Sequence, residues 1–188
     1  MTHCQRAEVL KHIDVRDLFL LNSRTIIVTG ATGGLGLQVV KATLQAGADV
    51  IAIDQSPSTP KGDDWEALIA TANRNGTLLH YWCCDVTIAE LTRQTFEQAV
   101  SKCRYPLRGL VHCAGIGWVG DTINFKVEEA RQIIDVNLMG TWICAQTTAQ
   151  LIQKHNLPAS LVFIARHTYG SLFSIESRSA SAHSQPGF

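Results

Sequence analysis

The sequence predicts an α/β protein in which helices cover both faces of a doubly wound parallel sheet. Three observations lead to this fold class. Strand-like apolar runs alternate with helical patterns along the whole chain. No repeat or linker divides the pattern, and glycines cluster between the first strand-like run and the first helix. Right-handed crossovers between parallel strands then predict the strand order 3-2-1-4-5.

Each element is predicted from its own pattern and punctuation. The predicted strands cover residues 24–29, 49–54, 77–83, 109–114 and 160–165, and the predicted helices cover residues 35–47, 64–76, 88–103 and 126–155. In the first helix, one face is expected to be buried and Gly47 is expected to end the helix; that face comprises Leu35, Val39, Ala42 and Ala46. Thr87 is expected to cap the third helix.

Length and composition indicate one globular domain. The expected organisation is a weakly patterned extension over residues 1–23, a domain over 24–165 and an irregular tail over 166–188. Sixteen basic residues balance sixteen acidic ones, so net charge recruits neither nucleic acid nor membrane. No apolar run approaches the ~20 residues of a membrane span. Six cysteines without a C-x-x-C pair favour reduced thiols in a cytoplasmic protein, and no metal site is expected.

The segment TGATGGLG, residues 29–36, follows the first strand and opens the first helix. Glycine is needed in such a turn because a Cβ would block both the tight backbone path and the approach of a pyrophosphate. The helix N-terminus then offers free N–H groups to the phosphates. The candidate phosphate-binding residues are Gly30, Thr32, Gly33, Gly34, Leu35 and Gly36.

Asp54 ends the second strand and is the candidate ribose-binding residue. Its carboxylate can accept hydrogen bonds from the hydroxyls of an adenine ribose and would repel a 2′-phosphate. Lys61 is the nearest following cation, beyond two prolines. The sequence therefore favours NAD over NADP as cofactor.

Four segments together resemble the short-chain dehydrogenase/reductase family over about residues 19–165: the T-G-x-x-x-G-x-G turn, CDVT at 84–87, HCAG at 112–115 and DVNLMG at 135–140. The sequence of these residues most resembles that of fungal-type polyol or sugar dehydrogenases. The resemblance implies a Rossmann-like, NAD(P)-binding oxidoreductase that acts on the CH–OH group of a polyol, sugar or other secondary alcohol or ketone. It implies cofactor contacts from Asp85, Val86, Cys113, Ala114 and Gly115, a catalytic role for Asn137, and a homo-oligomer formed through the helix 126–155.

The chain departs from the family's pattern in three places. Cys113 stands where the family has an Asn beside the cofactor, and Arg166 stands where a Ser is expected after the fifth strand. No Tyr-x-x-x-Lys follows; Tyr169, with Phe173 four residues later, is only a weak substitute. The family's later strands are also absent from the sequence.

In the family the Tyr and Lys carry the proton transfer that accompanies hydride transfer. We therefore expect the chain to bind NAD with little or no turnover. Two alternatives are a non-enzymatic NAD-binding protein and an unstable product.

Overall fold

The computed structural model describes residues 19–117, 121–154 and 157–165. It contains a five-stranded sheet in which every neighbouring pair is parallel, in the order β3-β2-β1-β4-β5. The predicted fold class and strand order are therefore confirmed. The strands are β1 Thr25–Thr29, β2 Asp49–Asp54, β3 Leu79–Cys83, β4 Leu107–His112 and β5 Ser160–Phe163.

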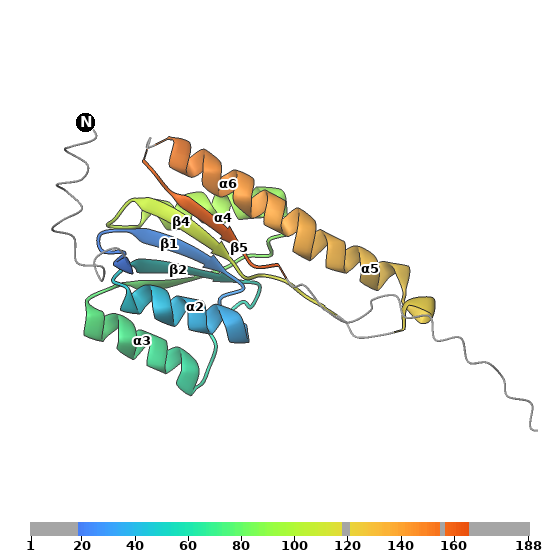
Figure 1. Ribbon diagram of the computed structural model, residues 1–188, viewed down its shortest axis with the longest axis horizontal. Helices are drawn as coiled ribbons and strands as arrows, with labels where there is room; N and C mark the ends of the chain where they lie inside the picture. Colours follow the sequence, from blue (N-terminus) through green and yellow to red (C-terminus); the bar gives the residue numbers. More distant parts are fainter. Residues whose placement is uncertain (1–18, 118–120, 155–156, 166–188) are drawn as a thin grey trace, which may run out of the picture.

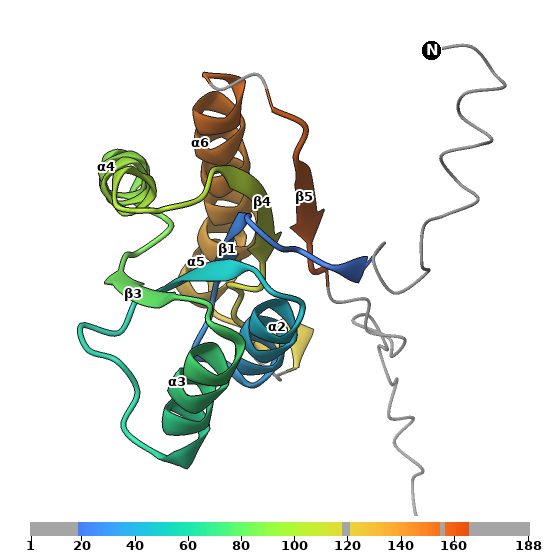
Figure 2. The same cartoon turned by 90° about the vertical axis from the view of Figure 1, so that its left-hand side faces the viewer.

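Helices form a layer on each face of the sheet (Figures 1 and 2). On one face lie α2 Gly34–Gln45 and α3 Asp63–Asn75; on the other lie α4 Ala89–Ser101 and α6 Thr141–Gln153. The two layers bury separate clusters of apolar side chains, represented by Val28, Val40 and Leu44 on the first face and by Ile27 and Phe96 on the second. Because β1 and β2 are covered from both sides, their sequences read as nearly unbroken apolar runs.

A long helical segment replaces the single helix predicted over 126–155. It consists of α5 Val127–Ile134, a π-helical stretch η3 Asp135–Gly140, and α6. A short 3₁₀ turn, η2 Thr122–Asn124, precedes it. Figure 1 shows α5 projecting beyond the edge of the sheet, and α5 contains no buried residue.

The predicted buried face of the first helix is wrong. The structure buries Gly36, Val40, Thr43 and Leu44, whereas Leu35 is 53% exposed. The cause is a close backbone approach, because a Cβ added at Gly36 would lie 2.0 Å from the carbonyl oxygen of Gly30. This approach turns Gly36 toward the sheet, and the buried stripe continues from it at helical spacing.

The predicted Thr87 cap is also wrong. The N-cap of α4 is Ile88, and no side chain caps this helix. The hydroxyl of Thr87 instead donates a hydrogen bond of 2.7 Å to Asp85 Oδ1, and its N–H donates to the same oxygen at 2.9 Å. The carboxylate thus closes a local Asp turn before the helix begins.

The described part of the N-terminal extension contacts the domain, since the Leu21 N–H donates to Ala46 O at 2.7 Å. The expected irregular tail, with Arg166 and Tyr169, lies outside the described residues, as does most of the extension. The domain boundaries therefore stay predictions. Within the described ranges, no helix combines the length and the apolar character that crossing a membrane requires.

Candidate functional site

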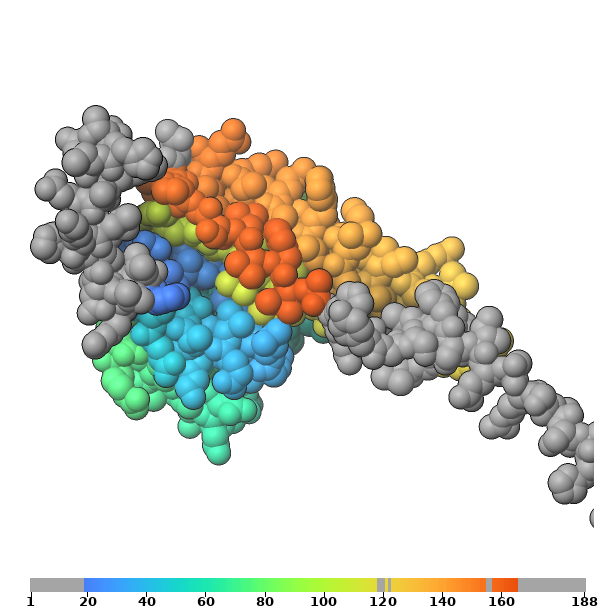
Figure 3. All heavy atoms as spheres, viewed as in Figure 1, coloured from blue at the N-terminus to red at the C-terminus, as the bar shows by residue number. Residues whose placement is uncertain are grey.

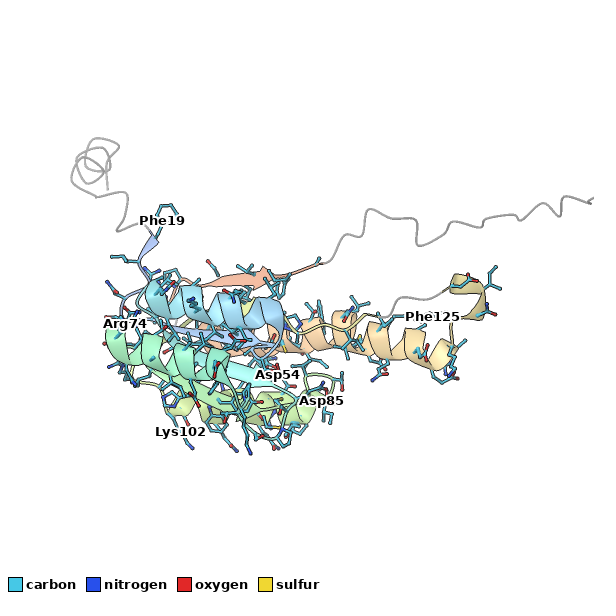
Figure 4. The ribbon with its side chains drawn as sticks, turned by 90° about the horizontal axis from the view of Figure 1, so that it is seen from below. Phe19, Asp54, Arg74, Asp85, Lys102 and Phe125 are labelled. Carbon is cyan, nitrogen blue, oxygen red and sulfur yellow. The ribbon has the colours of Figure 1, made fainter. Side chains whose placement is uncertain are left out.

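A pocket of about 420 Å³ opens at the edge of the sheet where the parallel strands end. Figure 4 shows Asp54 and Asp85 near this same edge. Ligands of doubly wound folds bind at the carboxyl ends of the strands. The described lining residues are Gly30, Thr32, Gly33, Ile53, Asp54, Gln55, Cys84, Asp85, Val86, Cys113, Ala114, Gly115, Ile116, Gln132 and Val136.

The glycine-rich turn contains positions that require glycine and one that leaves space. Gly30 has φ +62°, and a Cβ there would lie 2.6 Å from Ala114 Cα. Gly36 is blocked by the carbonyl oxygen of Gly30. A Cβ at Gly34, in contrast, would meet nothing within 4 Å. The backbone packing therefore explains Gly30 and Gly36, and the open space at Gly34 is available to a group from outside the chain.

The N-terminus of α2 faces this turn without a side-chain cap. Gly33 is its N-cap residue and makes no side-chain hydrogen bond, and no acidic residue lies in the first turn. The first N–H groups of a helix have no intrahelical acceptor and carry the positive end of its dipole. The turn can therefore hold an anion such as a pyrophosphate, which fits the group that the sequence predicts here.

Asp54 is held in place by the chain itself. Its Oδ2 accepts hydrogen bonds from Thr32 N (2.9 Å) and Thr32 Oγ1 (2.7 Å), and its Oδ1 accepts one from Gln55 N (2.8 Å). A carboxylate offers about four acceptor sites, so one remains on Oδ1. Recognition of both ribose hydroxyls by Asp54 therefore requires the Thr32 hydroxyl to give up its bond. None of the described lining residues is Lys or Arg.

The segment after β3 forms another wall of the pocket. Asp85 is fixed by its two bonds from Thr87. Val86 is buried against the end of η3, where a Cβ on Gly140 would meet Val86 Cγ2 at 2.9 Å. The neighbouring Cys84 thiol is buried, and burial raises its pKa above the ordinary value. The thiol is therefore protonated near neutral pH and is not a nucleophile of this pocket.

The segment after β4 lies directly against the glycine-rich turn. Cys113 N donates to Thr29 O at 3.1 Å, and Thr29 Oγ1 lies 2.7 Å from His112 Nδ1. The thiol of Cys113 is partly buried, which raises its pKa. These contacts join the ends of β1 and β4, so the backbone of Ala114 and Gly115 has a fixed position beside Gly30.

Asn137 lies in η3 and binds the backbone that follows Gly115. Its Oδ1 accepts from Ile116 N and its Nδ2 donates to Ile116 O, both at 2.8 Å. The Asn137 carbonyl oxygen accepts the Thr141 hydroxyl at 2.7 Å. Single π-helical turns often mark functional sites; here the turn presents one side chain to both backbone groups of Ile116.

The structure brings most of the predicted site residues together. Nine of the twelve predicted cofactor residues line the pocket; the other three, Gly34, Leu35 and Gly36, form the first turn of α2 beside it. Asn137 reaches the pocket through Ile116. The lining residues that sequence reasoning missed are Ile53, Gln55, Cys84, Ile116, Gln132 and Val136. Four of these flank predicted residues in sequence, and Gln132 and Val136 share a helical face at i, i+4 spacing, which is the only signal they carry.

Arg166, at the position where a Ser is expected, and Tyr169, the weak substitute for the missing Tyr, lie beyond the described residues. Across residues 19–117, 121–154 and 157–165, no group of three His, Cys, Asp or Glu side chains is arranged to hold a metal ion.

Known proteins with similar sequences and structures identify the family. The short chain dehydrogenase profile matches residues 24–168. A short chain dehydrogenase/reductase of Aspergillus versicolor is 40% identical over 153 residues, covering 81% of this chain and 52% of the relative. A probable NADP-dependent mannitol dehydrogenase of Yarrowia lipolytica is 30% identical over 158 residues, covering 81% and 53%.

A crystal structure of a short-chain type dehydrogenase/reductase from Mycobacterium marinum superposes with a TM-score of 0.70 at 26% identity, covering 80% of this chain and 59% of that one. The chain spans about half the length of the curated relatives it matches. From the family match over residues 24–168 and the similarity to these relatives, the chain belongs to the short-chain dehydrogenase/reductase family.

Proposed function

We propose that residues 24–165 bind NAD(H) as the cofactor half of an oxidoreductase that acts on a secondary alcohol or ketone. One observation carries the proposal: the uncapped N-terminus of α2, Asp54, and the backbone from Cys113 to Gly115 converge on one pocket. These groups offer an anion site, hydrogen-bond acceptors and a backbone wall within one cavity.

Different residues of the pocket would contact different parts of the cofactor. The N–H groups of Gly34 and Leu35 would hold the pyrophosphate, and Asp54 would accept a ribose hydroxyl. Asp85 and Val86 would contact the adenine, and Ala114 and Gly115 would face the second ribose and the nicotinamide. When bound, the nicotinamide ring supplies or accepts the hydride.

Charge supports NAD rather than NADP. Asp54 carries a negative charge where a 2′-phosphate would sit, and the described lining residues bring no cation to offset it. The Yarrowia relative is named NADP-dependent, so the proposed preference rests on the charge of this chain's own pocket.

The names of the relatives support a substrate class. The Yarrowia relative is named a mannitol dehydrogenase, and we propose a polyol, sugar or similar alcohol as substrate. Asn137 would position the backbone at Ile116 rather than move a proton itself.

The 188 residues contain no Tyr-x-x-x-Lys, and a positioned acid/base is worth ~10²–10⁴-fold in rate. We therefore propose that this chain by itself binds nucleotide with little turnover. A non-enzymatic NAD-binding role is the second candidate, and a turnover measurement separates it from the first.

We also propose self-association through the long helix. Ile134, Leu138 and Trp142 follow one another at i, i+4 spacing and are 53%, 63% and 63% exposed. Figure 3 shows this helix and β5 side by side on one face of the molecule, and Val162 and Phe163 of β5 are also exposed. Several exposed apolar side chains on one helix face are typical of an interaction site.

Calorimetric titration of the purified chain with NAD, NADH, NADP and NADPH tests the proposal. Saturable NAD(H) binding that is tighter than NADP(H) binding supports it. A folded chain that binds none of the four contradicts it, and an unfolded chain identifies an unstable product. Reduction of NAD in the presence of polyols then separates an enzyme from a binding protein.

A further inference from the structure

His112 is a buried polar residue that the proposed chemistry does not use. It ends β4, is 1% exposed, and pairs in register with Thr29 at the end of β1. Its Nδ1 lies 2.7 Å from Thr29 Oγ1, and its Nε2 has no hydrogen-bond partner among the described residues. A buried imidazole with one short bond and one unpartnered nitrogen calls for an explanation.

The contacts of Thr29 select one tautomer of the ring. Ala114 N also donates a long hydrogen bond of 3.5 Å to Thr29 Oγ1. Because Thr29 Oγ1 accepts this bond, its own proton is donated elsewhere, and among the hydrogen bonds of the described residues the acceptor is His112 Nδ1. If Nδ1 accepts, Nε2–H is the single unsatisfied group; if Nδ1 carries the proton, both the hydroxyl and Nε2 lack partners. Since each buried unsatisfied group is costly, the contacts favour the neutral ring protonated at Nε2.

This chain of hydrogen bonds ends at the wall of the pocket. It runs from His112 through Thr29 to the N–H of Ala114, and Ala114 lies against Gly30, where an added Cβ would be 2.6 Å from Ala114 Cα. Gly115 follows, and a Cβ added to it would lie 3.4 Å from Asn137 Oδ1. A small displacement of Ala114 would therefore alter both the glycine-rich turn and the contact with Asn137.

We propose that His112 is a positioning residue for the nucleotide site: as a neutral acceptor it orients the Thr29 hydroxyl, and Thr29 fixes the Ala114–Gly115 backbone in the binding geometry. This inference rests on the proposed nucleotide binding of the same pocket. It differs from a purely structural role, in which His112 and Thr29 would contribute independently to stability and neither would act on affinity through the other.

A double-mutant cycle on NADH affinity tests the coupling. His112→Phe removes the acceptor, and Thr29→Val removes the hydroxyl at nearly constant volume. Each is expected to weaken NADH binding by about tenfold, the effect of one buried hydrogen bond. Because both substitutions remove the same contact, the double variant is expected to bind NADH about tenfold more weakly in total, the same loss as each single variant, rather than a hundredfold more weakly. Additive losses overturn the proposal.

Two further variants sharpen the test. His112→Asn keeps an acceptor near the position of Nδ1 and is expected to restore most of the affinity. Thr148→Val removes another fully buried hydroxyl without a partner, which lies in α6 outside the pocket lining, and is expected to leave affinity unchanged. An Asn variant as weak as the Phe variant, or an equal loss in Thr148→Val, contradicts positioning by His112.

Amide and imidazole NMR keep the test valid if the wild-type chain binds no NADH. That result would remove the proposed nucleotide site, but the positioning role would still be measurable. We expect the Nε2–H tautomer, and we expect Thr29→Val and His112→Phe to shift the Ala114 and Gly115 amide resonances while Thr148→Val does not. Unchanged Ala114 and Gly115 resonances, or a proton on Nδ1, would overturn the inference.

Discussion

Two regions of the protein, β1–α2–β2 and the edge strand β5 with the long helix, bury their apolar side chains to different extents. β1 is buried at every position and β2 at all but its last, whereas three of the four residues of β5 are exposed. The helices differ in the same way: α2 buries a regular stripe on the sheet, while α5 buries nothing. The β1–α2–β2 unit is therefore a closed packing unit, and the β5–long-helix side presents apolar surface outward.

This difference separates two kinds of requirement on the sequence. In the closed unit, residues such as Gly36 are fixed by backbone contacts within the protein. On the open side, residues such as Leu138 and Trp142 contribute little to the fold that the structure describes and matter for contacts made outward. Substitutions in the closed unit should thus change the free energy of unfolding, and substitutions on the open side should mainly change self-association.

Gly36→Ala is expected to have the largest effect, because its Cβ would lie 2.0 Å from Gly30 O in a backbone that is packed on both sides. We expect a loss of at least about 3 kcal/mol in the free energy of unfolding, measured by urea denaturation. Gly34→Ala is the matched control. Its Cβ meets nothing within 4 Å, so stability should stay the same or rise by up to about 1 kcal/mol. Equal losses in the two variants would show that the close approach at Gly36 is not what the turn requires.

His112, the last residue of β4, predicts how the stability of the protein depends on pH. Burial lowers its pKa from 6.5 to about 4, so the unfolded chain binds a proton that the folded chain excludes between these values. Stability from this residue is fully present above about pH 6.5 and is lost as pH falls toward 4, by about 3 kcal/mol in total.

The measurement is urea unfolding from pH 7.5 to pH 4 for the wild type and His112→Asn. Other groups titrate in both proteins, so the difference between the two profiles isolates the imidazole. A difference that stays constant with pH would contradict a buried neutral ring.

Asp54→Asn tests the charge at the pocket's ribose end. The variant removes one negative charge at nearly constant shape, so the ratio of NADP to NAD affinity should rise by about tenfold, or roughly 1.4 kcal/mol. The ratio is informative because any loss from disturbing the Thr32 contacts affects both cofactors alike. An unchanged ratio in calorimetry would mean that Asp54 does not set the preference.

Leu138→Ser and Trp142→Ser are expected to have the smallest effect on stability. Both side chains are 63% exposed, so the free energy of unfolding should change by no more than about 0.5 kcal/mol. Self-association, measured by sedimentation velocity, should weaken. Gln146→Ser, one turn further along the same helix and also exposed, is the polar control and should leave association unchanged. Equal association in all three variants would place the interface elsewhere.

The sequence predicted the sheet order and the edge that carries the site, because period and punctuation are local and parallel strands all end at one edge. It did not predict which face of α2 is buried, since that depends on the contact of Gly36 in the helix with Gly30 O in the turn before it. Asn137 was identified by resemblance, but its two bonds to Ile116 depend on the π-helical turn. The pairing of Thr29 with His112, 83 residues apart, follows only from strand register.

The most direct test of the account is NADH binding by the wild-type chain and by Gly34→Ala in parallel. The account predicts saturable binding by the wild type and at least tenfold weaker binding by the variant at unchanged stability, because the new methyl group fills space that the pyrophosphate needs. Equal affinities would show that the nucleotide does not lie at the N-terminus of α2, and the central claim would then be wrong.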